Sequence, residues 1–210
     1  KSIVVTGSNG KSTTCKIITH LLKKNKFNVE LGGNIGRPVL NLKIKKNIFF
    51  VIEASSFQLS HSQFIHPNYA FLLNVTNDHI DWHGSMQDYI KSKLKIFDLQ
   101  EKNNFALVNE NFKDIFRIKK YLSKLVSVKF RDYKKIKSQI KNSYLKSNTN
   151  DENMNFVYAL ARLLKIKKKS FIKSMNSFLG LPHRYEIFLK KKGITFINDS
   201  KATSFQATKF

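Results

Sequence analysis

A glycine-containing turn near the start of the chain has the residues and spacing of a phosphate-binding loop. An apolar run over 2–6 leads into it and a helix-compatible run over 11–25 leads out. A strand, a glycine turn and a helix N-terminus present backbone N–H groups and the positive end of the helix dipole to an anion. The residues that would surround a bound nucleotide are Gly7, Ser8, Asn9, Gly10, Lys11, Ser12, Thr13 and Thr14. The pattern predicts that Lys11 reaches the terminal phosphates and that the Ser12 hydroxyl ligates Mg²⁺.

The usual phosphate-loop pattern has a further glycine five positions before Gly10, where this chain has Val5. Only Gly7 and Gly10 remain. An ordinary strand-to-helix turn that happens to contain Gly-Lys-Ser therefore stays open as the alternative.

Two more polar segments follow apolar runs. Glu53 comes directly after the run over 48–52. A buried carboxylate is costly unless a cation or hydrogen-bond donors meet it. A Mg²⁺ held jointly with Ser12 and nucleotide phosphates would meet Glu53, and a helix-capping role is the alternative.

The loop over 74–84 carries two His and two Asp. Their crowding after an apolar strand favours His79 as a ligand. The alternatives are that the carboxylates cap the next helix and that His83 is an ordinary surface residue. From the residues alone, Lys93 reads as a solvated lysine.

The alternation of strand and helix patterns predicts an α/β fold with a mostly parallel sheet and flanking helices. The expected strands span 2–6, 27–31, 48–52, 71–75 and 105–108, and the expected helices span 11–25, 86–97, 112–122, 153–164 and 170–179. A hairpin is expected over 185–189 and 194–198, and the Lys-, Ser- and Asn-rich stretch over 131–150 reads as an irregular surface connection. Ligands of parallel sheets gather beyond the carboxyl ends of the strands, where the polar segments above fall.

Composition limits the class of protein. The chain has 210 residues, enough for one or two domains, and 41% hydrophobic content, which indicates a globular protein. No apolar run is long enough to span a bilayer, and the single cysteine excludes an internal disulfide and fits a reducing cytoplasm. Because the chain starts at Lys1 and not at Met, we expect a fragment of a longer protein.

The formal net charge of +24 suggests nucleic acid as a partner. However, the positive residues are nearly all Lys and are spread along the chain, whereas base readout and bidentate phosphate contacts favour Arg. A basic surface would still attract anionic substrates.

The motifs together resemble the Mur ligase family. The phosphate loop over 6–13, and the segment over 74–84 followed by Tyr89 and Lys93, are similar to the motifs of the whole family. Three further segments resemble its D-glutamate-adding branch, namely 33–36, 53–59 and the pair 180–184 with 197–203.

This resemblance implies a cytoplasmic, ATP-dependent ligase of peptidoglycan synthesis that joins D-glutamate to UDP-N-acetylmuramoyl-L-alanine through an acyl phosphate. It implies that residues 1–180 are a P-loop-type central ATP-binding domain and that 181–210 start a C-terminal domain. The N-terminal UDP-binding domain would be absent. A monomer without nucleic-acid or membrane partners is expected.

The resemblance also implies roles for single residues. Catalysis would depend on Lys11, His79 and Lys93 with two Mg²⁺ ions. Ser12 and Glu53 would hold the first ion, and His79 and Lys93 the second, with Lys93 as a carbamate formed from CO₂. The implied contacts to the muramoyl substrate are Asn34, Ser55, Gln58 and His79. The implied nucleotide contacts beyond the loop are Asn153, Arg184, Asp199 and Lys201, the last three on closure about 180–183. The chain departs from the family at Phe156 and Ser204, where the family has Asn, so the helix of Asn153 lacks the second of the two family asparagines.

Two rival functions remain. Another amino-acid-adding ligase of the same family would share the loop over 74–84. A nucleotide- or nucleic-acid-binding module without ligase chemistry is favoured by the charge. It is disfavoured because aromatic and basic residues do not cluster as a stacking platform.

Overall fold

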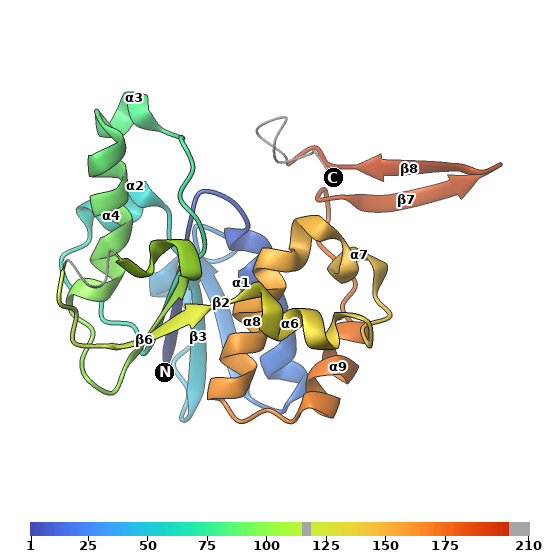
Figure 1. Ribbon diagram of the computed structural model, residues 1–210, viewed down its shortest axis with the longest axis horizontal. Coiled ribbons are helices and arrows are strands. Elements are labelled where there is room, and N and C mark those ends of the chain that lie inside the picture. The colour runs from blue at the N-terminus through green and yellow to red at the C-terminus, as the bar shows by residue number, and fades with distance from the viewer. Residues whose placement is uncertain (115–118, 202–210) are drawn as a thin grey trace.

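The computed structural model describes residues 1–114 and 119–201. A six-stranded sheet, ordered β2-β3-β1-β4-β5-β6 with every neighbouring pair parallel, forms its centre (Figure 1). The strands are β1 (Ser2–Thr6), β2 (Asn28–Gly33), β3 (Ile48–Glu53), β4 (Tyr69–Leu72), β5 (Phe105–Asn109) and β6 (Lys124–Val128). The predicted α/β class with a mostly parallel sheet is therefore confirmed.

Helices cover both faces of the sheet (Figure 1). One face packs on α1 (Lys11–Lys24), α6 (Phe130–Lys137), α7 (Ser143–Lys146), α8 (Asp151–Leu163) and α9 (Lys168–Asn176). The other carries α2 (Ser56–His61) and α4 (Met86–Asp98), and the short α3 (Ile80–His83) contacts α4. Short 3₁₀ turns are η1 (Val39–Asn41), η2 (Glu110–Phe112) and η3 (Asn148–Asn150). Because side chains alternate along a strand, Ile3 and Val5 of β1 enter the first core and Val4 enters the second.

The carboxyl end of β1 lies where the strand order changes direction. The chain leaves β1 through α1 toward β2 on one side, and β4 later pairs with β1 on the other side. Val5 is in register with Glu53 of β3, and Thr6 is in register with Leu72 of β4. Such a reversal opens a crevice beyond the strand ends, which is where open α/β sheets bind ligands.

The stretch over 131–150 is not the irregular surface connection that the sequence indicated. It contains α6, α7 and η3, and four of its apolar residues are buried in the core: Tyr133, Ile136, Ile140 and Leu145. The first three are spaced by three and four residues, the helical spacing, but the many intervening Lys and polar residues conceal it.

Two other expectations need correction. The strand expected over 71–75 is β4 at Tyr69–Leu72. After it, the Leu73 N–H donates to Thr6 O at the end of β1, and Asn74 O accepts from the Ser8 N–H of the loop that follows β1. The helix expected over 112–122 falls partly on 115–118, which lie outside the described residues. Residues 119–122 are not helical, and the unexpected strand β6 begins at Lys124.

The C-terminal part forms the expected hairpin. β7 (Glu186–Lys191) pairs antiparallel with β8 (Ile194–Asn198), and the hairpin projects from the body of the molecule (Figure 1). The motif residues Ala202, Thr203 and Ser204 lie outside the described residues. Among the helices of the described part, none is both long and apolar enough to cross a membrane.

Candidate active site

The turn after β1 has the geometry of an anion cradle. Gly10 caps α1 in a left-handed conformation with φ 81°, and α1 begins at Lys11. A Cβ atom at Gly10 would lie 2.2 Å from Oδ1 of the buried Asn153, so only glycine fits. Asn153 Oδ1 accepts a hydrogen bond from Thr14 Oγ1 at 3.1 Å, and its Nδ2 donates to Asn150 at 3.0 Å. The structure thus places Asn153 beneath the loop as a support, and its contact with a nucleotide stays a prediction.

The segment after β4 holds the other side of the loop. Asn74 Oδ1 accepts a hydrogen bond from the Asn9 backbone N–H at 2.8 Å, and Asn74 O accepts one from the Ser8 N–H at 3.0 Å. The Ser8 hydroxyl accepts a bond from the Thr76 N–H at 2.9 Å and lies 2.9 Å from Tyr89 Oη. The loop is therefore fixed by hydrogen bonds before any ligand arrives.

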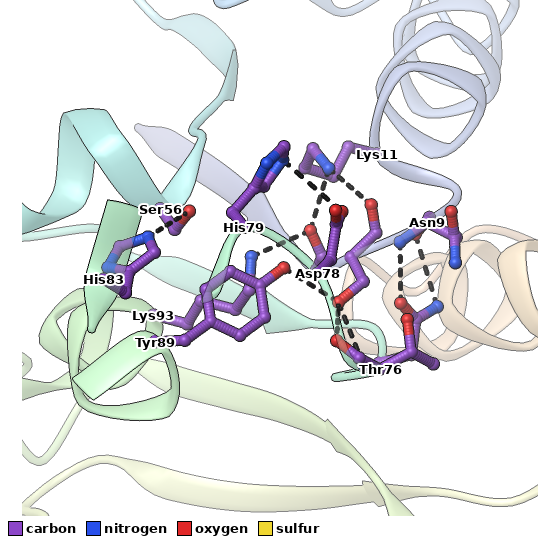
Figure 2. A network of polar contacts seen from close by, with 12 residues as sticks. Asn9, Lys11, Ser56, Thr76, Asp78, His79, His83, Tyr89 and Lys93 are labelled. Carbon is purple, nitrogen blue, oxygen red and sulfur yellow. Dashed lines mark hydrogen bonds and ion pairs between the residues drawn. The ribbon is translucent and has the colours of Figure 1, made fainter. Parts of the chain in front are cut away.

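Lys11 folds back over the loop (Figure 2). Its Nζ donates to the carbonyl oxygens of Gly7 at 2.8 Å and Ser8 at 2.7 Å. Burial lowers the pKa of Lys11, and the carboxylates of Glu53 and Asp78 partly offset that effect. Carbonyl oxygens solvate the ammonium group without neutralising it, so its charge stays available to a phosphate.

Lys93 on α4 is not a solvated lysine, because only 1% of it is exposed. Its Nζ donates to Gly7 O at 3.0 Å and lies 4.3 Å from the centre of the Tyr89 ring. Burial first, and the charge of Lys11 second, lower the pKa of Lys93 to about 7. Figure 2 shows Lys11 and Lys93 approaching the same loop carbonyl from opposite sides.

Glu53 at the end of β3 is 2% exposed. Its Oε1 accepts a hydrogen bond from Asn34 Nδ2 at 3.1 Å, and its buried Oε2 has no hydrogen-bond partner among the described residues. The alternative that Glu53 caps a helix is wrong, because Ser55 is the N-cap of α2. Asn34 thus lies against Glu53, beside Gly33, whose Cβ would lie 2.2 Å from Glu53 O.

A bound Mg²⁺ fits this donor set. The unpartnered Glu53 oxygen is a hard donor that a divalent cation would satisfy. Ser12 is the second residue of α1, the helix that follows β1, and Val5 of β1 is in register with Glu53. Within the described residues, His, Cys, Asp and Glu form no group of three that could hold a metal by themselves. Mg²⁺ is usually held by one or two carboxylates together with phosphates and waters, so one carboxylate and one hydroxyl suit it.

His79 stands at the N-terminus of α3 with φ 54°, a strained conformation for a non-glycine residue. Its Nε2 lies 3.4 Å from Asp78 Oδ2, and its ring packs on Phe57 at 4.9 Å. His83 is not an ordinary surface residue, since its Nε2 lies 3.0 Å from Ser56 Oγ and its ring stacks on Phe57.

Ser55 and Gln58 form the capping box of α2. Ser55 Oγ accepts from the Gln58 N–H at 3.2 Å, and Gln58 Oε1 accepts from the Ser55 N–H at 3.0 Å. Their expected contacts with a substrate stay predictions.

Two of the predicted C-terminal residues bond with the segment that leads into β7. Asp199 Oδ1 accepts from the Tyr185 N–H at 3.1 Å, and the Lys201 N–H donates to His183 O at 3.1 Å. The charge of Arg184 is among those that lower the pKa of Lys11, after burial. Arg184 is therefore the one of these three for which the electrostatics indicate proximity to the loop.

One residue of the site escaped sequence reasoning. Glu152 on α8 accepts hydrogen bonds from Asn74 and Asn109 and so joins the ends of two strands. No local pattern signals this role, because both partners of Glu152 are distant in the sequence.

Comparison with known proteins comes to the same family. Residues 5–178 match the Mur ligase middle domain. UDP-N-acetylmuramoylalanine–D-glutamate ligase from Rickettsia felis is 36% identical over 96% of this chain and 49% of its own length. The enzyme of that name from Pseudothermotoga lettingae is 32% identical over 98% of this chain and 49% of its own length. The chain thus spans about half the length of these curated relatives.

Solved structures agree on the fold. The MurF ligase from Thermotoga maritima in complex with ADP superposes with a TM-score of 0.67 and 18% identity, covering 95% of this chain and 53% of its own. MurC from the same organism superposes with a TM-score of 0.64 and 19% identity, covering 95% and 50%. The chain belongs to the Mur ligase family, and residues 5–178 are its middle domain.

Proposed function

We propose that the chain is the nucleotide-binding part of a cytoplasmic, ATP-dependent ligase that joins D-glutamate to UDP-N-acetylmuramoyl-L-alanine in peptidoglycan synthesis. The observation that carries the proposal is the cluster of Lys11, Lys93 and Glu53 around a phosphate-type loop at the end of β1. The names of the relatives at 32–37% identity support the choice of amino acid.

In the proposed reaction, the carboxylate of the muramoyl substrate attacks the γ-phosphorus of ATP and ADP leaves. The amine of D-glutamate then attacks the carbonyl carbon of the acyl phosphate, phosphate leaves, and the nitrogen loses a proton to water to give the amide. The first step spreads negative charge over phosphoryl oxygens, so it needs fixed positive charge more than an acid or base. Lys11 and the N-terminus of α1 supply that charge from this chain.

Two Mg²⁺ ions would add further positive charge at the phosphates. We assign Ser12 and Glu53 to one ion and His79 with Lys93 to the other. Lys93 can serve only after losing its positive charge. With a pKa of about 7, its neutral amine is well populated at cytoplasmic pH. The amine nitrogen can then bond to the carbon of CO₂ and release a proton to water, which leaves a carbamate with anionic oxygens.

The remaining roles complete the proposal. Residues 1–180 form the central domain and residues from 181 begin a C-terminal domain that brings Arg184, Asp199 and Lys201 to the nucleotide. Asn153 lies on the nucleotide side, and Asn34, Ser55 and Gln58 face the muramoyl substrate together with His79. The protein acts as a monomer, without nucleic acid or membrane.

The test uses the longer protein from which we propose the chain derives. Phosphate release from ATP is followed with UDP-N-acetylmuramoyl-L-alanine, and D-glutamate is compared with L-alanine, L-lysine and meso-diaminopimelate. Release that depends on D-glutamate alone is expected. Release with a different amino acid would keep the ligase and overturn its specificity, and no release despite ATP binding would favour a nucleotide-binding module instead.

A further inference from the structure

The carboxylate of Glu152 connects three segments that are distant in the sequence. Glu152 lies in the first turn of α8. Its Oε2 accepts a hydrogen bond of 2.5 Å from Nδ2 of Asn74, after β4, and its Oε1 accepts one of 2.8 Å from Nδ2 of Asn109, at the end of β5. One side chain thus joins the start of a helix to the carboxyl ends of two neighbouring strands.

Both asparagines are locked with their NH₂ groups toward Glu152. Asn74 Oδ1 is occupied by the Asn9 N–H, and Asn109 Oδ1 is occupied by the Asn111 N–H at 3.1 Å. Neither amide can rotate to offer its oxygen without losing a backbone hydrogen bond. The side chain at position 152 must therefore accept two hydrogen bonds from NH₂ groups and donate none, and among side chains of this size only an ionised carboxylate does so.

Opposing effects act on the ionisation of the Glu152 carboxyl. Burial raises the pKa of the Glu152 carboxyl, and the hydrogen bonds from Asn74 and Asn109 act in the opposite direction. The first turn of a helix is also where the helix dipole stabilises a negative charge.

The connection continues into the phosphate loop. Asn74 binds Asn9 twice, through the Asn9 N–H at 2.8 Å and through Asn9 O, to which Asn74 Nδ2 donates at 3.2 Å. Asn9 is one of the loop residues whose backbone would face a nucleotide. Asn74 Nδ2 also donates to Glu152, so the carboxylate of Glu152 helps to set the orientation of the Asn74 amide and, through it, the position of Asn9.

We propose that Glu152 is a positioning residue for nucleotide binding, holding the Asn74 amide in the orientation that fixes Asn9 of the phosphate loop. The part of this inference that concerns nucleotide binding rests on the proposed function. The part that concerns the position of the loop rests on the hydrogen bonds alone.

The first measurement needs no nucleotide. Amide hydrogen exchange of the Asn9 N–H, followed by NMR in the 210-residue chain, is compared between the native chain and Glu152→Gln. This substitution keeps nearly the same side-chain shape but turns one acceptor into a donor that faces an NH₂ group. We expect the Asn9 N–H to exchange about tenfold faster, the effect of about one hydrogen bond, while Val4 within β1 keeps its rate. An unchanged rate at Asn9 would overturn the inference.

The second measurement is the affinity for Mg·ATP by isothermal titration calorimetry. Glu152→Gln should bind about tenfold more weakly, which corresponds to about 1.4 kcal/mol. In the double variant Asn109→Asp with Glu152→Gln, the new amide NH₂ at position 152 faces a carboxylate at position 109, so the hydrogen bond between the two positions is restored in the reverse direction. The double variant should therefore return to within about threefold of the native affinity. Glu101→Gln is the matched control, because Glu101 is exposed and lies shortly before β5, at the amino ends of the strands and away from the phosphate loop.

The outcomes separate the two ideas. Native affinity in Glu152→Gln, or a double variant no better than the single one, would overturn the positioning role. Faster exchange at Asn9 in a chain that binds no Mg·ATP would support the role of Glu152 in the loop and contradict the proposed function.

Discussion

Two ammonium groups share one carbonyl oxygen at the centre of the site. Lys11 Nζ and Lys93 Nζ donate to Gly7 O at 2.8 and 3.0 Å. Burial lowers the pKa of both groups. For Lys93 the charge of Lys11 adds to burial and brings the pKa to about 7, whereas for Lys11 the carboxylates of Glu53 and Asp78 partly offset the effect of burial. The fold therefore singles out Lys93 as the lysine that can give up its proton near neutral pH.

The pKa of Lys93 makes the stability of the chain depend on pH. An unfolded lysine binds its proton up to its ordinary pKa of 10.5, whereas folded Lys93 releases it near 7. Between these values the unfolded state binds more protons, so stability rises with pH by at most about 1.4 kcal/mol per pH unit. Below pH 7 Lys93 is protonated in both the folded and the unfolded state, so its contribution to the free energy of unfolding no longer changes with pH. Lys93→Met removes this slope, which urea unfolding in CO₂-free buffer from pH 7 to 9.5 would measure.

The control for that series is Lys91→Met, since Lys91 is an exposed residue of the same helix. It should keep the native pH profile. Parallel profiles for the native chain and Lys93→Met would mean that Lys93 keeps an ordinary pKa.

The neutral amine of Lys93 should capture CO₂. In ¹³C-bicarbonate, we expect a carbamate resonance at pH 8 that weakens toward pH 6, where the amine is protonated and cannot attack carbon. Lys93→Arg should abolish the resonance, because a guanidinium stays protonated. A resonance that persists in Lys93→Arg would assign the carbamate to another amine.

Lys11 should dominate nucleotide affinity. Lys11→Ala removes the charge that the loop carbonyls of Gly7 and Ser8 hold in place. We expect Mg·ATP affinity to fall at least about a hundredfold, since a charged contact to phosphate is lost in a partly buried site. Lys16→Ala, at an exposed position of the same helix, is the control in the titration. Unchanged affinity in Lys11→Ala would remove the phosphate-loop assignment.

At the scale of elements, α6 is part of the core despite its basic sequence. Ile136 is 2% exposed and packs with Tyr133 against the face of the sheet that α8 covers. Ile136→Ala should lower the free energy of unfolding by about 2–5 kcal/mol through the cavity it leaves. Urea unfolding measures this, and Lys135→Ala on the exposed side of α6 should change it by less than about 0.5 kcal/mol. A small effect of Ile136→Ala would mean that α6 does not pack as described.

The elements that carry the site were predictable because each has a local signal. Continuous apolar runs identify buried parallel strands such as β1 and β3, and Gly10-Lys11 marks the start of α1. The segment with α6 lacked such a signal, because lysines between its apolar residues mask the helical spacing. Lys93 and Glu152 could not be predicted from local pattern, since their roles arise from contacts with Gly7, Asn74 and Asn109, which only the folded sheet brings together.

At the scale of the whole molecule, the net charge of +24 has a long-range effect. It attracts polyphosphates and nucleic acids alike, but attraction between exposed charges is screened with a Debye length of about 8 Å at physiological salt. The buried contacts of the site are screened much less. The charge therefore raises the rate of nucleotide encounter and does not select a nucleic-acid sequence.

The chain by itself should bind Mg·ATP weakly and ligate nothing. It spans about half the length of its relatives, and in the proposed function it holds the ATP site but only part of the muramoyl site. Binding of the muramoyl substrate and of D-glutamate would need parts of the longer protein. The 210 residues therefore lack the binding energy that holds all three reactants in the orientation for reaction. With all three substrates and Mg²⁺, a phosphate-release assay of the 210 residues should stay at the background rate of Lys11→Ala. Turnover above that background would show that the 210 residues already hold every substrate site, and it would contradict the division into domains at residue 180.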